Sequence, residues 1–255
     1  MESSSIFVGI ELQHAWRMYT FAALDANLKL LALRQGRLPE VVAYLAEDEA
    51  IIAAISAPRQ PNLGRMQRDE IRSALFAPLP GNHSADLRQV EYELLARGLP
   101  VPRTPSKTAS CPAWMRRGFR LVQELNEIGY AQFNAAGARR QLIETVPEVV
   151  FTSLLGHAPF PSESMEGRIQ RQLILWDHRL PVRDPMVFFE EVTRHKLLLG
   201  MLPKELIYAA DELDALMAAN VAYVAGRSPK ELILIGDRQE GQIALPVAAL
   251  KERYS

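Results

Sequence analysis

Hydrophobic residues near the N-terminus fall into three short runs separated by polar turn residues. The runs are Ile6–Ile10, Arg17–Leu24 and Leu28–Leu33, and the turn residues Asp25, Ala26 and Asn27 lie between the second and the third run. Runs of this length are typical of β-strands, and Asp and Asn favour tight connections. We therefore expect an antiparallel meander of three strands at the start of the chain.

A helix and a buried strand are predicted to follow this meander. Pro39 suits the first turn of a helix over about Leu38 to Asp48. The next apolar stretch, Ala50–Ile55, carries no polar residue, which is typical of a strand covered on both faces. Pro58 then prevents the strand from continuing, so that the chain begins with the order βββαβ.

The segment from about residue 59 to residue 138 differs from its surroundings, because it combines many prolines with arginines and short helical patterns. Its prolines are at positions 61, 78, 80, 100, 102, 105 and 112, and its clearest helix is Trp114–Ile128. It retains enough apolar residues to pack against the rest of the chain. We expect an ordered, helical, proline-rich insertion.

The second half of the chain continues with strands and helices. We predict a strand at Gln141–Val146, helices at Pro147–Leu155, Asp184–Leu199 and Asp211–Gly226, and a final hairpin of Leu232–Ile235 with Gln242–Leu245. The whole chain, residues 1–255, is then one α/β domain. Its mixed sheet would contain three antiparallel strands and further parallel strands, with helices on both faces.

Composition narrows the class of protein without assigning a function. The 255 residues carry a formal net charge of −1, so no overall basic field draws the chain to nucleic acid or membranes. Cys111 is the only cysteine, which fits a reducing compartment. Neither a leader peptide nor a long apolar span is evident, and we expect a cytoplasmic protein without a membrane segment. The sequence carries no signal of oligomeric state.

Carboxylates occur where the predicted strands end and where a predicted helix begins. Glu11 ends the first strand, Glu144 lies on a later one, and Asp211 and Asp214 open the helix up to Gly226. In α/β sheets, ligands gather at the carboxyl ends of the strands. Crowded carboxylates repel one another or recruit a cation, and Mg²⁺ or Mn²⁺ matches oxygen ligands of this kind. Ser56, which ends the strand between them, could add a hydroxyl.

Each carboxylate also has a structural explanation that the sequence leaves open. Asp211 and Asp214 have the spacing of an N-cap residue and its partner in the first turn. Glu11 could be an exposed strand end, and Glu144 could pair with Arg139 or Arg140. After the acids, a stripe of small residues suits close packing on a sheet, which would bring the acids to the strand ends under either explanation; the stripe consists of Ala215, Ala218, Ala222 and Ala225.

Arginines of the insertion form a second candidate site. Arg68 and Arg72 are four residues apart on one helical face, and Arg116 and Arg117 adjoin Trp114. Such a local basic patch could bind the phosphates of a nucleic acid while the aromatic ring stacks on bases. The alternatives are a solvated helix face and surface pairing of Arg68 and Arg72 with the neighbouring acids.

Eight stretches in a fixed order resemble the family called domain of unknown function 429, or DUF429, over nearly the full chain. They are "FVGIEL", "AISAPRQPNLGRMQRDEIR", "EYELLARGLPVPRTP", "CPAWMRRGFRLVQEL", "LIETVPEVVFTSLLG", "EGRIQRQLIL", "DELDALMAANVAYVAG" and "EGQIALP". The resemblance implies a ribonuclease-H-like fold related to RuvC-type resolvases. The chain departs from the family pattern at Glu11 and Ser56, where relatives usually or often carry aspartate.

The resemblance implies a metal-dependent nuclease that hydrolyses phosphodiester bonds of a nucleic acid. Glu11, Glu144, Asp211 and Asp214 would be the catalytic and metal-binding residues of a site for two Mg²⁺ or Mn²⁺ ions. Two alternatives remain: a ribonuclease-H-like binding module that has lost catalysis, which Ser56 favours, and an actin-like phosphotransferase, against which the lack of glycine-rich phosphate turns counts.

Overall fold

The described residues contain eight strands that form one mixed sheet. The computed structural model of the protein describes residues 5–13, 18–48, 50–75 and 85–254. The sheet order is β3-β2-β1-β4-β6-β8-β7, and β5 pairs with β6 beside this path. The strands are β1 (Ile6–Glu11), β2 (Tyr19–Leu24), β3 (Leu30–Gly36), β4 (Ile51–Ile55), β5 (Ala131–Gln132), β6 (Arg140–Glu144), β7 (Ile233–Ile235) and β8 (Ile243–Leu245).

Strand directions confirm the mixed α/β sheet that the sequence predicts. β1, β2 and β3 form an antiparallel meander. From β1 the sheet continues through β4, β6 and β8 in parallel, and β7 closes it as an antiparallel hairpin with β8. In the predicted turn, the backbone N–H of Asn27 donates to Oδ1 of Asp25 over 2.8 Å. The carboxyl ends of the four parallel strands therefore meet at one edge of the sheet.

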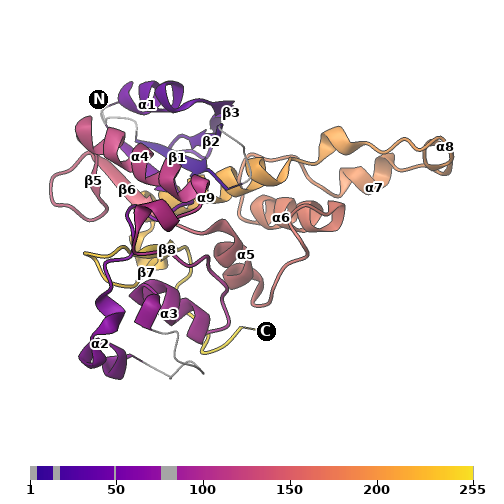
Figure 1. The fold of residues 1–255 in the computed structure, drawn as a ribbon. Coiled ribbons are helices and arrows are strands. Elements are labelled where there is room, and N and C mark those ends of the chain that lie inside the picture. Colours follow the sequence, from indigo (N-terminus) through magenta and orange to yellow (C-terminus); the bar gives the residue numbers. More distant parts are fainter. Residues whose placement is uncertain (1–4, 14–17, 49, 76–84, 255) are drawn as a thin grey trace.

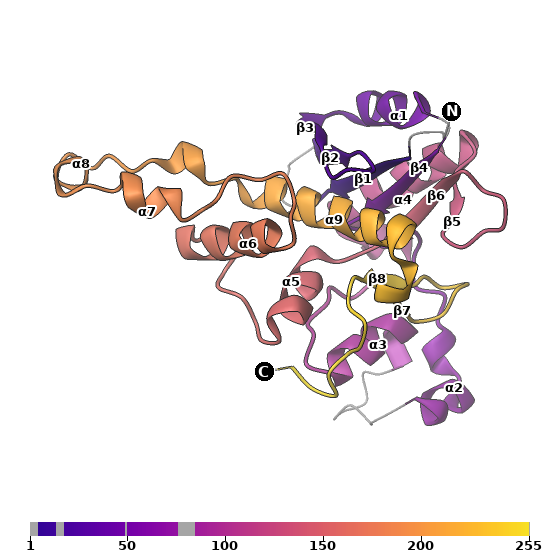
Figure 2. The same ribbon diagram turned by 180° about the vertical axis from the view of Figure 1, so that it is seen from behind.

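Helices cover both faces of the sheet (Figures 1 and 2). α1 (Leu38–Ala46) and α4 (Ala113–Glu127) bury their apolar residues with one face. α5 (Pro147–Leu155) and α9 (Ala210–Arg227) contribute to the core on the other face, where α6 (Met165–Asp177) packs beside α9. Among the helices of the described chain, none combines the length and the apolar character that crossing a bilayer would require.

The proline-rich insertion supplies both a core helix and a peripheral unit. α4 lies within it in sequence, yet Leu121 and Leu125 are fully buried against the sheet. α2 (Asp69–Ala74) and α3 (Gln89–Ala96) lie beyond the β7 side of the sheet (Figure 1). Two of the insertion's prolines, at positions 78 and 80, lie outside the described residues.

The helix expected over Asp184–Leu199 is wrong, because the chain forms two short helices there. They are α7 (Val187–Glu191) and α8 (Arg194–Leu198). Thr193 separates them in an extended conformation, and its hydroxyl accepts the N–H of Lys196 over 3.2 Å as the N-cap of α8. The sequence pattern also failed to predict α6, although Ser164 caps it in the same way.

The centre of the fold is a contact between the backbones of β1 and α9. A Cβ atom added at Gly9 would stand 2.7 Å from the carbonyl carbon of Ala218 and would overlap backbone atoms of Ala215 and Ala219. The predicted stripe of alanines therefore packs on the sheet as expected, and glycine at position 9 completes it. The residues at this contact are glycine and alanine, so the two backbones can meet directly.

We predict that Gly9→Ala lowers the free energy of unfolding by about 3 kcal/mol, because the new methyl group must push α9 away from the sheet. The matched control is Gly36→Ala in β3, where the nearest atom to an added Cβ is the flexible carboxylate of Glu40 at 3.3 Å. Urea unfolding followed by circular dichroism measures both variants. Equal stabilities of the two variants would contradict the close-contact explanation.

Candidate functional site

Glu11 lies opposite the first turns of α9. Successive side chains of β1 point to opposite faces of the sheet, so every second residue, Phe7, Gly9 and Glu11, faces α9. Phe7 contacts the far end of α9, where its ring lies 5.2 Å from that of Tyr223, and Gly9 contacts the middle of the helix. One step further along β1 leads to the start of α9. Glu11 is only 1% exposed there, and one of its oxygens accepts the N–H of Gln13.

Asp211 is held beside Glu11 by two strands of the meander. Thr20 is the cross-strand neighbour of Glu11, and its hydroxyl donates to Oδ2 of Asp211 over 2.6 Å. Gln35, the neighbour of Thr20 on β3, donates to the same oxygen over 2.9 Å. Asp211 therefore anchors the start of α9 to β2 and β3.

A row of buried polar residues crosses four strands at this level. Thr20, Glu11, Ser56 and Thr145 are neighbours on β2, on β1 and just after β4 and β6. The hydrogen bonds between neighbouring strands continue to this level. The N–H of Ser56 donates to the carbonyl of Ile10 over 2.9 Å, and the N–H of Thr145 donates to the carbonyl of Ile55 over 3.0 Å. All four are at most 1% exposed. The hydroxyl oxygen of Ser56 accepts the N–H of Leu12 over 3.2 Å, so the side chain of Ser56 holds the backbone directly after β1 in place.

Glu212, and not Asp211 or Asp214, performs the capping role at the start of α9. Its carboxylate accepts the N–H of Ala209 over 2.8 Å. Glu212 thereby occupies the position from which a first-turn acid satisfies a free backbone N–H. The explanation that Asp211 and Asp214 form the cap of the helix is thus wrong. Asp211 bonds to Thr20 and Gln35 instead, and Asp214 lines a cavity.

Asp214 lines a cavity of about 370 Å³ next to the carboxyl ends of β1 and β6. The carboxylate is 7% exposed. Gln13 and Glu148 also line the cavity, and Glu148 pairs with the buried Arg171 at 2.5 Å. The remaining lining residues are Pro100, Val101, Pro102, Val146, Pro147 and Ser162. No lysine or arginine is among these described lining residues, although Arg171 compensates the charge of Glu148.

Glu144 points away from this cavity, toward the opposite face of the sheet. It is the register neighbour of Ile55, which packs with α1 and α4. Glu144 also lines a small cavity together with Val122 and Asn126 of α4. Because neighbours in register share a face, Glu144 and Glu11 lie on different faces. The structure brings Glu11, Asp211 and Asp214 together and leaves Glu144 apart from them.

Glu144 instead forms a buried ion pair with Arg88. The guanidinium donates to both carboxylate oxygens, over 2.6 Å and 3.1 Å, and its Nε donates to Glu91 over 2.8 Å. Arg140, one of the two partners that the sequence suggested, donates instead to backbone carbonyls, including that of Ile128. We call Arg88, Glu91 and Glu144 the Arg88 cluster.

Arg88 is stabilised in its charged form by the two carboxylates of the cluster, because burial excludes solvent from all three groups. The pKa of the Arg88 guanidinium lies above its ordinary value: burial lowers it, but the charges and hydrogen bonds of Glu144 and Glu91 raise it by more. Gly241 makes room for the pair, because a Cβ there would stand 2.9 Å from Arg88 and from Glu144. Sequence reasoning missed Arg88 because nothing around it marks a buried arginine.

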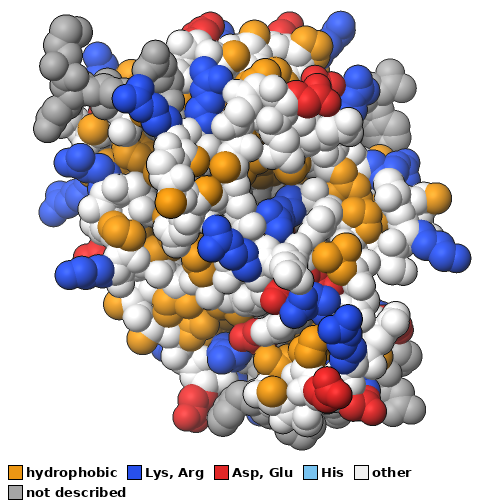
Figure 3. Space-filling model, turned by 90° about the vertical axis from the view of Figure 1, so that its left-hand side faces the viewer, with side chains coloured by type: hydrophobic (Ala, Val, Ile, Leu, Met, Phe, Trp, Pro, Cys, Tyr) orange, Lys and Arg blue, Asp and Glu red, His pale blue; other side chains and the backbone are white. Residues whose placement is uncertain are grey.

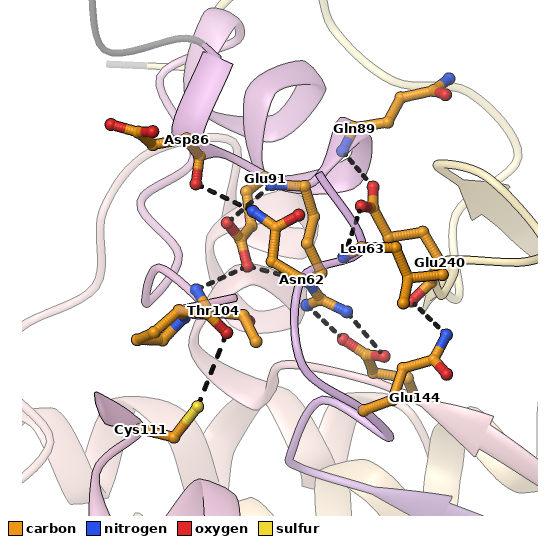
Figure 4. Close-up of polar contacts among 12 residues, drawn as sticks. Asn62, Leu63, Asp86, Gln89, Glu91, Thr104, Cys111, Glu144 and Glu240 are labelled. Atoms are coloured by element: carbon orange, nitrogen blue, oxygen red, sulfur yellow. Dashed lines mark hydrogen bonds and ion pairs between the residues drawn. The ribbon is translucent and has the colours of Figure 1, made fainter. Parts of the chain in front are cut away.

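A second buried carboxylate fastens the insertion to the C-terminal hairpin. Glu240 is fully buried and accepts the N–H groups of Leu63 and Gln89 over 3.2 Å and 2.9 Å. Figure 4 shows this contact beside the bonds of Glu91 and Glu144. Glu240 accepts the N–H of Gln89, and Glu144 pairs with the side chain of the neighbouring Arg88, so two buried carboxylates bind the start of α3. These contacts form a structural clamp that attaches the insertion to this end of the sheet.

The arginines predicted to bind phosphate are mostly bonded within the chain. Arg116 donates to the carbonyl of Cys111 over 2.5 Å, and Arg117 donates to the carbonyls of Leu12 and Met18. Arg72 pairs with Asp69, as the alternative explanation expected, whereas Arg68 is exposed. On the face shown in Figure 3, the basic side chains are separated by neutral and apolar ones. Nucleic-acid binding through a basic patch stays a prediction.

The converging acids offer fewer metal ligands than the sequence predicts. Among the described residues, no group of three or more His, Cys, Asp or Glu side chains is arranged to hold a metal ion. Glu144 is neutralised by Arg88, and Asp211 is bonded to Thr20 and Gln35. The four carboxylates therefore do not fit a two-ion site. Glu11 and Asp214 fit the smaller ligand set of one Mg²⁺ ion, which needs one or two carboxylates beside substrate oxygens.

A family model described as "Protein of unknown function (DUF429)" matches residues 46–237, well over half of the chain. This range includes the insertion, the Arg88 cluster and α9, and it leaves out the meander with Glu11. No curated protein and no solved structure matches the chain.

We predict that Arg88→Met lowers the free energy of unfolding by about 3 to 5 kcal/mol, because it leaves two buried carboxylates without their cation. The control is Arg120→Met, which removes an exposed arginine that lies 3.8 Å from Glu124, and it should cost less than about 1 kcal/mol. Urea unfolding at neutral pH compares the two. A small loss for Arg88→Met would show that the clamp contributes little.

Proposed function

The chain belongs to the DUF429 family, and from this premise and the site geometry we propose that it is a ribonuclease-H-like hydrolase of phosphodiester bonds. Its substrate is a nucleic acid. The sheet order supports the proposal, since an antiparallel meander leads into parallel strands and an acid ends the first strand. The last large helix crosses that strand with its acidic end at the same edge.

The observation that carries the proposal is that two buried carboxylates from distant parts of the chain lie at the same end of the contact between β1 and α9. Glu11 at the end of β1 faces the start of α9, and Asp214 in α9 lines the cavity of about 370 Å³. Glu212 already caps the helix and Asp211 already anchors it, so the start of α9 needs Asp214 for neither task.

A divalent cation is the group that this chemistry would require in the cavity. Asp214 contributes a carboxylate, Arg171 compensates the charge of Glu148, and the described lining residues include no lysine or arginine that could bind a phosphate. One Mg²⁺ or Mn²⁺ ion held by Glu11 and Asp214 would attract and polarise the phosphate and acidify a water molecule.

The residues of the chain have separate tasks under this proposal. Glu11 and Asp214 bind the ion, and Asp211 keeps the start of α9 at the correct distance through Thr20 and Gln35. Gln13 lines the cavity and offers an amide to the substrate or to water. The apolar prolines of the cavity wall exclude bulk water, which strengthens charge interactions within it.

We predict that Mn²⁺ or Mg²⁺ raises the melting temperature by several degrees once its concentration greatly exceeds the dissociation constant, because it binds only the folded chain. Glu11→Gln and Asp214→Asn should each abolish this increase. Glu144→Gln is the matched control: it should lower the melting temperature without metal but keep the metal-dependent increase, since Glu144 lies on the other face. Thermal melts over a series of metal concentrations measure all four proteins.

A catalytically inactive binding module is the second candidate function. The uncharged Ser56 in the polar row and the neutralised Glu144 favour it, because both reduce the number of carboxylates at the site. Such a module would bind nucleic acid in the absence of metal and would show no metal-dependent stabilisation. The melting series therefore separates the two candidates before any substrate is tested.

We predict metal-dependent cleavage of at least one among branched DNA, an RNA–DNA hybrid and single strands, and its loss in Asp214→Asn. Gel electrophoresis of end-labelled substrates measures cleavage. Leu63→Ala, which removes an exposed side chain outside the cavity, is the control for preparation effects. Metal-dependent stabilisation without cleavage of any phosphodiester would refute the hydrolase proposal.

A further inference from the structure

Residues 183–206 form an arm that projects from the body of the protein. It contains α7 and α8 and ends with the short 3-10 helix η4 (Lys204–Leu206). Figures 1 and 2 show it from opposite sides, and in both views it extends past α6 with no other element alongside its tip. Each helix has about five residues, too few to build a core of its own.

The arm carries most of the exposed large hydrophobic side chains of the described chain. Eight of the twelve lie in it, and Leu198 is the most exposed at 78%. They are Met186, Val187, Phe189, Leu197, Leu198, Leu199, Met201 and Leu202. Exposed apolar side chains gathered in one segment in this number are unusual on a monomer and are typical of a protein interface.

The charges of the arm are balanced and separated along it. Glu190 and Glu191 end α7, whereas Arg194 and Lys196 lie in α8. Lys196 already pairs with Glu191 at 2.7 Å, which leaves Glu190 and Arg194 for other partners. A surface without net charge is poorly suited to nucleic acid or to an anionic membrane. Two copies related by a two-fold axis would instead bring acidic and basic ends together.

We propose that the arm is the dimerisation surface of this protein and that its occupant is the arm of a second copy. A standard interface uses about 20 to 30 residues from each partner, and residues 183–206 are of that number. The apolar residues form the centre, as in homodimers, and Glu190 of one copy faces Arg194 of the other. The proposal does not depend on hydrolase activity.

Dimerisation also constrains the acidic end of α9. Only Ile207, Tyr208 and Ala209 separate the arm from this helix. Gln172 of α6 holds the connection, because its side-chain oxygen accepts the N–H of Tyr208 over 2.9 Å and its amide donates to the carbonyl of Leu206 over 3.1 Å. An arm fixed by a second copy would thus fix the start of α9.

The test is sedimentation velocity of the full chain over a wide concentration range. We expect a monomer–dimer equilibrium in the wild type and a dissociation constant at least about 30-fold higher in the double variant Phe189→Asp with Leu198→Asp. The matched control is Phe160→Asp with Leu63→Asp. These side chains are 57% and 55% exposed but lie outside the arm, so the control should dimerise like the wild type.

Charge exchange tests the two-fold arrangement itself. Glu190→Arg and Arg194→Glu should each weaken the homodimer, because like charges then meet at both contacts. An equimolar mixture of the two variants should restore dimers, since each charge again meets its opposite. A mixture that stays as weak as its components would overturn the proposed pairing.

A wild type that remains monomeric at every concentration would overturn the proposal, as would equal weakening of the arm variant and its control. If the monomeric wild type floats with anionic vesicles, and the arm variant does not, the arm is a membrane contact and the dimer proposal is equally refuted.

Discussion

The backbones of β1 and α9 meet at Gly9, and the arrangement of the whole α9 side depends on this contact. With no side chain between them, the helix lies directly on the central strand and extends to β2 and β4. A helix held this closely can shift little along the strand. Its first turns therefore lie at the end of β1, where Asp211 bonds to Thr20 and Glu11 completes the polar row.

Strand alternation divides the buried charges into two groups with different roles. Glu11 faces α9, whereas Glu144, two strands away and one register step earlier, faces α4. On the α4 side the carboxylate is compensated by Arg88 from the insertion, which stabilises the fold. On the α9 side Glu148 pairs with Arg171, and Asp214 lines the cavity. The same residue type is structural in the Arg88 cluster and, under the proposed function, binds the ion on the other face.

The sequence predicted the parts of this arrangement that depend on local pattern. Apolar runs and turn residues such as Asp25 gave the meander, and the alanine stripe gave the close packing of α9. Glu144 shows where this reasoning ends, because a single register step decides which face a strand residue occupies. Arg88 is 56 residues away from its partner in sequence, and no local pattern links the two. The break at Thr193 was missed because no proline or glycine between Glu190 and Lys196 marks the end of a helix.

The start of α9 links the arm, the anchoring residues and the cavity. Asp211 fixes its position against β2 and β3, Glu212 closes its first turn, and Asp214 reaches the cavity. The arm enters three residues earlier and has few buried contacts of its own, so it belongs to the least stable part of the fold. Motion of a free arm would act first on this turn. A partner that orders the arm would therefore reduce motion at Asp214 without touching the cavity. Binding at the arm would in this way be coupled to the proposed site.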